Sequence, residues 1–132
     1  MQVGGTNLLL NSDFLDIWAK ESNVGIINNG NYYKITSSAE GHWGIYQDVQ
    51  VSPNTIYTLS FVAFDGYGAY AIGNGATNVW YGLTGYITIQ TNTINSITFT
   101  TESTQTSARI YFTALNTNNY IEIYKPKLEK GN

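Results

Sequence analysis

The sequence predicts an all-β chain that folds as an antiparallel β-sandwich of the jelly-roll type. Apolar and polar residues alternate with a period of two along most of the 132 residues, and helical periodicity is almost absent. Gly, Asn and Ser separate the alternating segments at intervals of roughly 8–12 residues, as in sandwich strands. We therefore expect one domain over 1–132, long enough to bury a core and cut from a longer chain.

The individual strands follow from this alternation. The segment IYTLSFVAF (56–64) places Tyr57, Leu59, Phe61 and Ala63 on one face of a strand. GIYQDVQV (44–51) alternates in the same way, and SPNT (52–55) is a turn between the two strands. Further strands are predicted at 7–10, 24–27, 31–37, 68–73, 78–81, 84–90, 93–100, 107–114 and 119–125. Helix is expected only as a turn near Asp16–Glu21.

Composition and charge exclude several classes of function. The net charge is −3 with only 11% charged residues, and the six basic residues are scattered instead of forming the basic stripe that nucleic acid requires. No apolar run approaches the roughly 20 residues of a membrane span. The chain has no cysteine, which excludes disulfides and a thiol nucleophile. A polar, weakly charged surface is common in secreted and virion proteins, so we expect an extracellular location without nucleic acid or membrane as partner.

Aromatic side chains are more numerous than one core of this size needs. The chain has 3 Trp, 11 Tyr and 5 Phe. The rings expected in the core are Phe14, Trp18, Tyr57, Phe61, Phe99 and Phe112. Tyr111 and Tyr124 fit either the core or the surface, and the remaining rings are candidates for a surface role.

The stretch DGYGAYAIGNGATNVWYG (65–82) has the composition of a ligand-binding loop. Tyr67, Tyr70, Trp80 and Tyr81 flank a GNGATN turn, whose glycines carry no side chains that would block access to the rings. No clean buried face is visible along this stretch, which favours exposure of the rings. The alternative is a hairpin whose rings cover the open end of the sandwich.

Flat rings stack on the apolar faces of sugars while nearby polar groups bond the hydroxyls. Asp65, Asn74 and Asn78 are candidates for such bonds, and Trp43 is either a stacking residue or a packing residue at the rim of the core. The sequence thus predicts a shallow carbohydrate-binding groove. Its residues are Trp43, Tyr46, Asp65, Tyr67, Tyr70, Asn74, Trp80 and Tyr81.

Three short stretches carry a family resemblance: NLLLNSDF followed by Trp18, YQDVQVSPNTIYTLSF, and IEIYKPKLEKGN. Together they resemble carbohydrate-binding modules of the jelly-roll, galactose-binding-like type in tail and baseplate proteins of phages that infect Gram-positive bacteria. The resemblance implies a virion protein that attaches to cell-wall polysaccharide or another glycan of the host, joined to other tail proteins through its parent chain. The alternatives are a structural or oligomerising tail domain, and the binding module of a secreted polysaccharide hydrolase.

Catalysis is not expected from this sequence. Glycoside hydrolysis needs two carboxylates at a set separation, and the one candidate pair is Asp48 and Asp65 on strands expected to be neighbours. His42 lacks a serine nucleophile in a G-x-S-x-G turn. No cofactor is expected beyond a possible structural calcium, for which Asp13, Asp16 and Glu122 are the candidates, with solvated surface acids as the alternative.

Overall fold

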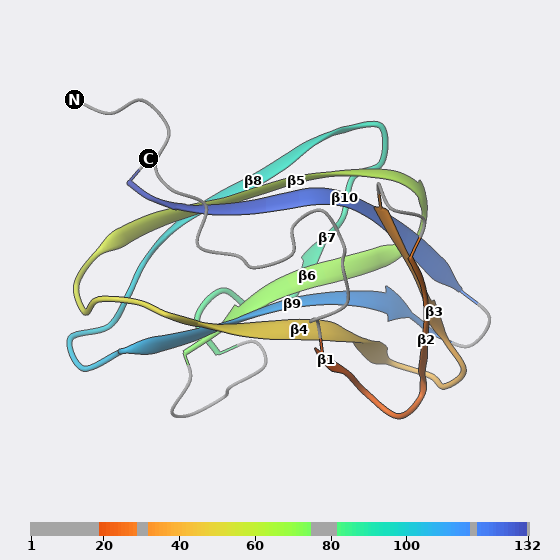
Figure 1. Cartoon of the computed structure of the whole chain (residues 1–132), viewed down its shortest axis with the longest axis horizontal. Helices are drawn as coiled ribbons and strands as arrows, with labels where there is room; N and C mark the ends of the chain where they lie inside the picture. Colours follow the sequence, from red (N-terminus) through yellow and green to blue (C-terminus); the bar gives the residue numbers. More distant parts are fainter. Residues whose placement is uncertain (1–18, 29–31, 75–81, 117–118, 132) are drawn as a thin grey trace.

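Two five-stranded antiparallel sheets face each other across one hydrophobic core (Figure 1). A computed structural model of the chain describes residues 19–28, 32–74, 82–116 and 119–131. In spatial order, sheet A contains β1 (Ala19–Lys20), β4 (His42–Gln50), β9 (Ser107–Leu115), β6 (Gly68–Gly73) and β7 (Ile87–Thr88). Sheet B contains β2 (Val24–Asn28), β3 (Tyr32–Ser37), β10 (Tyr120–Lys130), β5 (Ile56–Gly66) and β8 (Thr93–Thr100).

The order of the strands is that of a jelly roll. Most successive strands lie in opposite sheets, so the chain repeatedly crosses from one layer to the other at the ends of the sandwich (Figure 1). The predicted all-β, antiparallel sandwich is therefore confirmed. Within the described ranges, no helix is long and apolar enough to cross a membrane.

Most predicted strands form, with two differences at the level of single elements. The segment 84–90 contributes only the two-residue strand β7. The helical turn expected near Asp16–Glu21 is wrong for Ala19 and Lys20, which form β1 because their backbone pairs with Tyr46 and Ile45 at the edge of sheet A. The predicted strands at 7–10 and 78–81 lie outside the described residues, as do Phe14 and Trp18.

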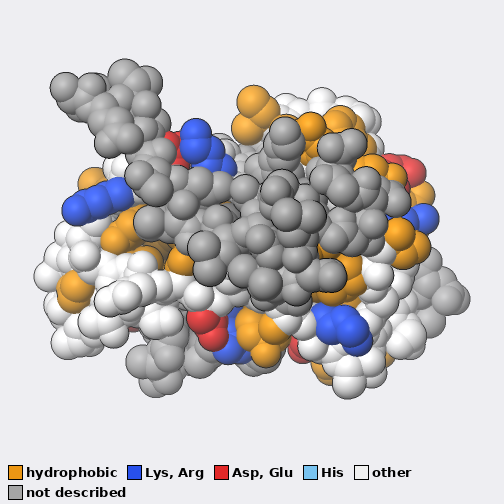
Figure 2. Space-filling model, viewed as in Figure 1, with side chains coloured by type: hydrophobic (Ala, Val, Ile, Leu, Met, Phe, Trp, Pro, Cys, Tyr) orange, Lys and Arg blue, Asp and Glu red, His pale blue; other side chains and the backbone are white. Residues whose placement is uncertain are grey.

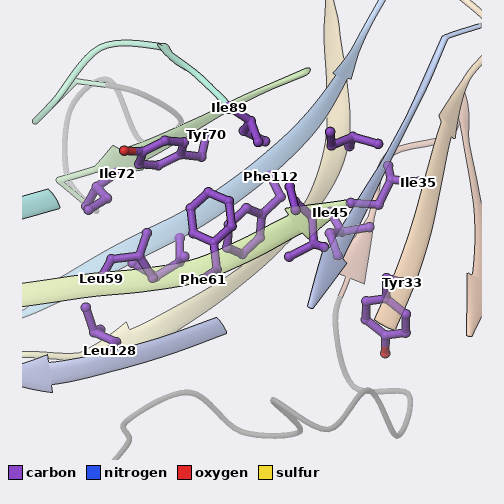
Figure 3. Packing of buried hydrophobic residues seen from close by; sticks show 14 of the residues in the cluster. Tyr33, Ile35, Ile45, Leu59, Phe61, Tyr70, Ile72, Ile89, Phe112 and Leu128 are labelled. Carbon is purple, nitrogen blue, oxygen red and sulfur yellow. The ribbon is translucent and has the colours of Figure 1, made fainter. Parts of the chain in front are cut away.

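Aromatic rings from both sheets meet in the core. Phe61 of β5 contacts Tyr70 of β6 and Phe112 of β9 edge-on, with ring centroids 4.8 Å apart in both pairs. Figure 3 shows the three rings grouped between the layers. The core positions predicted for Tyr57, Phe61, Phe99 and Phe112 are confirmed, because all four side chains are buried.

Strand β6 is buried on both of its faces, which explains why its sequence does not alternate. Tyr70 and Ile72 point into the core, and the intervening Ala69 and Ala71 on the outer face are also buried. Small side chains on the outward positions and large ones on the inward positions give an apolar run without a polar face. Over Gly68–Gly73, the missing alternation therefore reflects burial on two sides, not exposure.

Close approach of β4 and β9 makes Gly44 a position that accepts no side chain. A β-carbon at Gly44 would lie 1.7 Å from the backbone oxygen of Phe112. That oxygen belongs to the neighbouring strand, so it cannot move aside without separating β4 from β9.

We expect Gly44→Ala to lower the free energy of unfolding by about 3 kcal/mol, because the added methyl group overpacks the space between two strands. Urea denaturation measures the change. Gly85→Ala is the control, since a β-carbon there meets nothing within 4 Å and only the backbone angle φ of 71° is unfavourable. The control should cost about 1 kcal/mol, and equal losses in the two variants would contradict the steric explanation.

Candidate functional site

Strand β4 carries a row of polar and aromatic side chains on the outer face of sheet A. His42, Tyr46 and Asp48 lie on the outward row of this strand, which also includes Gly44, while Ile45 and Val49 face the core. At about 3.3 Å per residue, the row from His42 to Asp48 is about 20 Å long. We call this row, together with Tyr86 and Arg109 beside it, the sheet A platform.

At one end of the platform, a guanidinium–carboxylate pair lies against a tyrosine ring. Arg109 on β9 is the direct cross-strand partner of Asp48 and donates two hydrogen bonds to its carboxylate, at 2.7 and 2.9 Å. The guanidinium carbon lies 4.1 Å from the centroid of the Tyr46 ring. The Arg109 side chain is 17% exposed and that of Asp48 is 48% exposed, so the carboxylate is the more accessible member.

At the other end of the platform, an imidazole and a phenol ring stack on each other. The rings of His42 and Tyr86 are almost parallel, with an interplanar angle of 9° and centroids 3.7 Å apart. Tyr86 remains 38% exposed. Burial lowers the pKa of His42 below its ordinary value of 6.5, which favours the neutral imidazole.

Between these two ends, Tyr111 forms a buried floor. Tyr111 is 1% exposed, and its hydroxyl donates to the carboxylate of Glu21 and, at 3.1 Å, to the backbone oxygen of His42. The same carboxylate accepts the backbone N–H of Gly44 at 2.9 Å. Burial, and then the hydrogen bond to Glu21, raise the pKa of Tyr111 far above its ordinary value, so the phenol remains a donor. These bonds fix the position of β4.

A hollow adjoins the carboxylate end of the platform. Its volume is about 580 Å³, and it continues from Asp48 along Gln50 and Ser52 to Lys130 at the end of β10. The platform itself is an open surface, and this hollow extends it beyond the edge of sheet A. An elongated, open surface with aromatic rings and a few charged groups suits an extended polar ligand.

The predicted site residues that the structure describes do not lie together in one groove. Tyr46 lies on the sheet A platform. Trp43 points the other way, is half-buried against the core, and donates its indole N–H to the backbone oxygen of Glu40 at 2.6 Å. This arrangement agrees with the alternative that Trp43 packs at the rim of the core.

The prediction that Tyr70 contacts a ligand is wrong, and the candidates close to it in sequence are spread along the sandwich. Tyr70 is 4% exposed and packs on Phe61 inside the core, so its ring face is not available to a ligand. Asn74 is buried and donates to the carboxylate of Glu102 at 3.1 Å. Asp65 and Tyr67 precede β6 whereas Asn74 follows it, so the length of a strand separates them.

At their end of the sandwich, Asp65 and Tyr67 stand next to the start of β10. Asp65 accepts a hydrogen bond from the hydroxyl of Tyr120 at 2.7 Å, and Tyr67 is 50% exposed. Trp80, Tyr81 and Asn78 lie outside the described residues. The placement expected for the one candidate carboxylate pair is wrong: Asp48 on β4 and Asp65 on β5 lie in different sheets, not on neighbouring strands.

Nothing in the described residues supports a metal centre. No group of three or more His, Asp and Glu side chains that could hold a metal ion occurs among them. Glu122 lies on β10 opposite Lys34 of β3. The other two calcium candidates, Asp13 and Asp16, fall outside the part of the chain that the structure describes.

Of the platform residues, only Tyr46 is among the carbohydrate contacts predicted from the sequence. His42 and Asp48 were considered only for catalysis, and Arg109 and Tyr86 were missed altogether. Arg109 is the sole charged residue within the apolar strand segment ARIYFTAL, which is a usable signal for a functional or paired charge on a sheet face. Tyr86 is flanked by Gly85 and the short strand β7, and no sequence pattern indicates that it stacks on His42.

Comparison with known proteins identifies the fold. No protein-family model and no curated protein matches the chain. Among solved structures, the CBM22-1 xylan-binding domain from Paenibacillus barcinonensis superposes with a TM-score of 0.66, at 10% identity over 98% of this chain and 97% of that domain. The carbohydrate-binding module CBM6cm-2 of lichenase 5A from Cellvibrio mixtus, solved in complex with cellotriose, superposes with a TM-score of 0.55. The identity is 12%, over 96% of this chain and 100% of that one.

A phage protein contains the same fold as one part of a larger chain. The enzymatically active domain of tailspike protein 4 from bacteriophage CBA120 gives a TM-score of 0.66 at 13% identity, over 95% of this chain and 21% of that one. At these identities the likeness establishes architecture alone. The chain has the jelly-roll sandwich fold that carbohydrate-binding modules share.

We expect the native pKa of His42 to lie below 6.5. Because the unfolded chain then binds this proton more readily than the folded one, the contribution of His42 to stability is present above pH 6.5 and is lost as the pH falls through the native pKa. The chain has a single histidine, so its ring signals in an NMR titration are unambiguous. His42→Gln should remove the pH dependence of unfolding in this window. A native pKa at or above 6.5 would contradict the burial of the imidazole.

Proposed function

We propose that this chain is a non-catalytic carbohydrate-binding module and that the sheet A platform is its saccharide site. The observation that carries the proposal is the placement of Tyr86 and the Arg109–Asp48 pair on one sheet face of a fold that carbohydrate-binding modules share. Asp48 and Asp65 lie in separate sheets, so they do not form the carboxylate pair that was considered for hydrolysis.

The platform offers the two kinds of contact that sugars need. The exposed part of Tyr86 provides an apolar ring surface for the C–H face of a sugar, and the stack on His42 holds this ring in one orientation. The half-exposed carboxylate of Asp48 accepts hydrogen bonds from hydroxyls, and Arg109 holds it in place. One face of the Tyr46 ring lies against Arg109, so Tyr46 contributes its edge and hydroxyl.

The biological setting that we propose is the tail or baseplate of a phage that infects Gram-positive bacteria. The module would attach the virion to cell-wall saccharide of the host, as an extracellular part of a longer tail protein. Two observations support this setting: the motif resemblance, which includes the ending KLEKGN, and the occurrence of the fold within a phage tailspike protein. An open platform binds one saccharide weakly, and many copies on one particle would supply the avidity.

We expect the purified domain to bind Gram-positive cell walls, and Tyr86→Ala to weaken binding by at least about fivefold, as for a centrally placed aromatic contact. A pull-down on purified cell walls measures the change in binding. Insoluble xylan and cellulose are tested in parallel, because the binding module of a polysaccharide hydrolase would prefer them to cell walls. Phe64→Ala is the matched control, because Phe64 is also an exposed ring but lies on sheet B. Circular dichroism checks folding. Absence of binding to walls and polysaccharides alike would overturn the proposal.

An exposed apolar stripe on sheet B favours an oligomerising domain as a second candidate function. Tyr32, Tyr124, Val62 and Ile94 are successive cross-strand partners on β3, β10, β5 and β8. Ile94 is 70% exposed, and Phe64 extends the stripe by packing edge-on against Tyr124 at 5.5 Å. Figure 2 shows hydrophobic side chains protruding above β8 and β5 at the top of the view. The stripe carries no charge, so a second copy of this chain could cover it with its own stripe without burying an unpaired charge.

If sheet B forms this interface, the domain should sediment as a dimer at micromolar concentration, and Ile94→Glu should convert it to a monomer, because a charge in an apolar contact is strongly unfavourable. Analytical ultracentrifugation distinguishes the two states. Thr98→Glu is the control, since this exposed residue lies on the same strand outside the stripe. A wild-type monomer at all concentrations would exclude this second function and leave the carbohydrate proposal unaffected.

A further inference from the structure

A polar groove lies on the outer face of sheet B, at the corner formed by the start of β2, the end of β3 and the start of β10. Its volume is about 540 Å³, and the residues that line it include Ser22, Asn23, Gly25, Lys34, Thr36 and Tyr120. The groove is separate from the sheet A platform, because the two surfaces lie on opposite sheets. Hydroxyl, amide and ammonium groups dominate its lining.

Among the described residues, the Lys34 ammonium in this groove has no carboxylate within ion-pair distance, although Glu122 is its cross-strand neighbour. The ammonium group of Lys34 lies 4.5 Å from the centroid of the Tyr120 ring, and no carboxylate oxygen of the described residues lies within 4.0 Å of it. The Tyr120 ring is itself held by the hydrogen bond from its hydroxyl to Asp65, at 2.7 Å. Lys34 is therefore a positive group held over a fixed aromatic ring.

Gly25 opens the floor of the groove beside Lys34. A β-carbon at this position would lie 2.6 Å from the hydroxyl oxygen of Thr36, the next outward residue of β3 after Lys34. Without a side chain at Gly25, the Thr36 hydroxyl bonds only weakly, at 3.3 Å, to the backbone oxygen of Gly25. Ser22 and Asn23 add a hydroxyl and a side-chain amide to the lining of the groove.

We propose that this groove is a second ligand site and that its ligand is an acidic saccharide. A carboxylate or phosphate of the ligand would pair with Lys34, while its hydroxyls bond Ser22, Asn23 and Thr36. The protein has a net charge of −3, and Glu122 and Asp65 lie beside this corner, so an anionic group binds in the groove only by pairing directly with the Lys34 ammonium. The site goes beyond the proposed function, because it gives one domain two saccharide sites on opposite faces.

The test is an NMR titration of the ¹⁵N-labelled domain with trigalacturonic acid, its methyl ester and glycerol phosphate. We expect the acid to shift the amide signals of 22–25, 34–38 and 119–120, and the uncharged ester to leave them unchanged. Comparison of glycerol phosphate with the acid shows whether the groove prefers phosphate or carboxylate. Shifts of the groove amides with either anion support the site. Raising the salt concentration to 1 M should weaken the interaction, because it screens the charge pair.

Lys34→Gln should weaken binding of the acidic probe by about tenfold, as expected for the loss of one charge-assisted hydrogen bond. Lys127→Gln is the matched control, because it removes the same charge from an exposed position of β10 on the same sheet. Gly25→Ala, which fills the floor of the groove, should also weaken binding. Tyr86→Ala on sheet A should leave it unchanged, so failure of the platform and failure of the groove are separate results.

The second site would be overturned if neither anion shifted the groove amides. Equal affinity of Lys34→Gln and wild type for the acidic probe, or equal binding of the acid and its ester, would also overturn it. Shifts confined to sheet A would also overturn it, since the acidic probe would then occupy the platform.

Discussion

Contacts between Phe61 and two rings of the opposite sheet fix the arrangement on which the rest of the molecule depends. Phe61 comes from sheet B, and it meets Tyr70 and Phe112 of sheet A edge-on. Loss of a buried ring of this kind typically costs about 3–5 kcal/mol, a large fraction of the stability of a small domain. Because side chains of a strand alternate between its faces, these three inward positions also determine which residues of β6 and β9 face outward.

The outward faces of β4 and β9 follow from this register. With Phe112 inside, Tyr111 and Arg109 point out from sheet A, where they stand opposite Tyr46 and Asp48. The Glu21 carboxylate accepts hydrogen bonds from the Tyr111 hydroxyl and from the backbone N–H of Gly44. These two bonds connect β4 and β9 to the chain that follows β1. The platform therefore rests on paired strands and buried hydrogen bonds, which is the kind of support that holds a binding surface in one geometry.

The two sheets present different chemistry to the outside. Sheet A exposes a ring and a charge pair along β4, whereas sheet B combines an apolar stripe with a polar groove that contains Lys34. On the face shown in Figure 2, the Lys and Arg side chains of the described residues are spread singly, in keeping with the six basic residues scattered along the sequence. A module with ligand sites on opposite faces could connect two glycan chains, or one glycan and a neighbouring copy, and gain avidity from both.

The sequence by itself determined the strands and most of the core, because alternation with a period of two is a local property that each segment carries. The segments 56–64 and 107–114 show this directly, since the inward rings Phe61 and Phe112 can be read from them. Only the tertiary structure decided where the site lies. Arg109 and Asp48 pair across 61 positions of sequence. Tyr70 points into the core, but β6 is buried on both faces, so its sequence lacks the alternation that would have identified the inward side. Pairing between distant strands and burial on a second face depend on which strands become neighbours, and no local pattern contains that information.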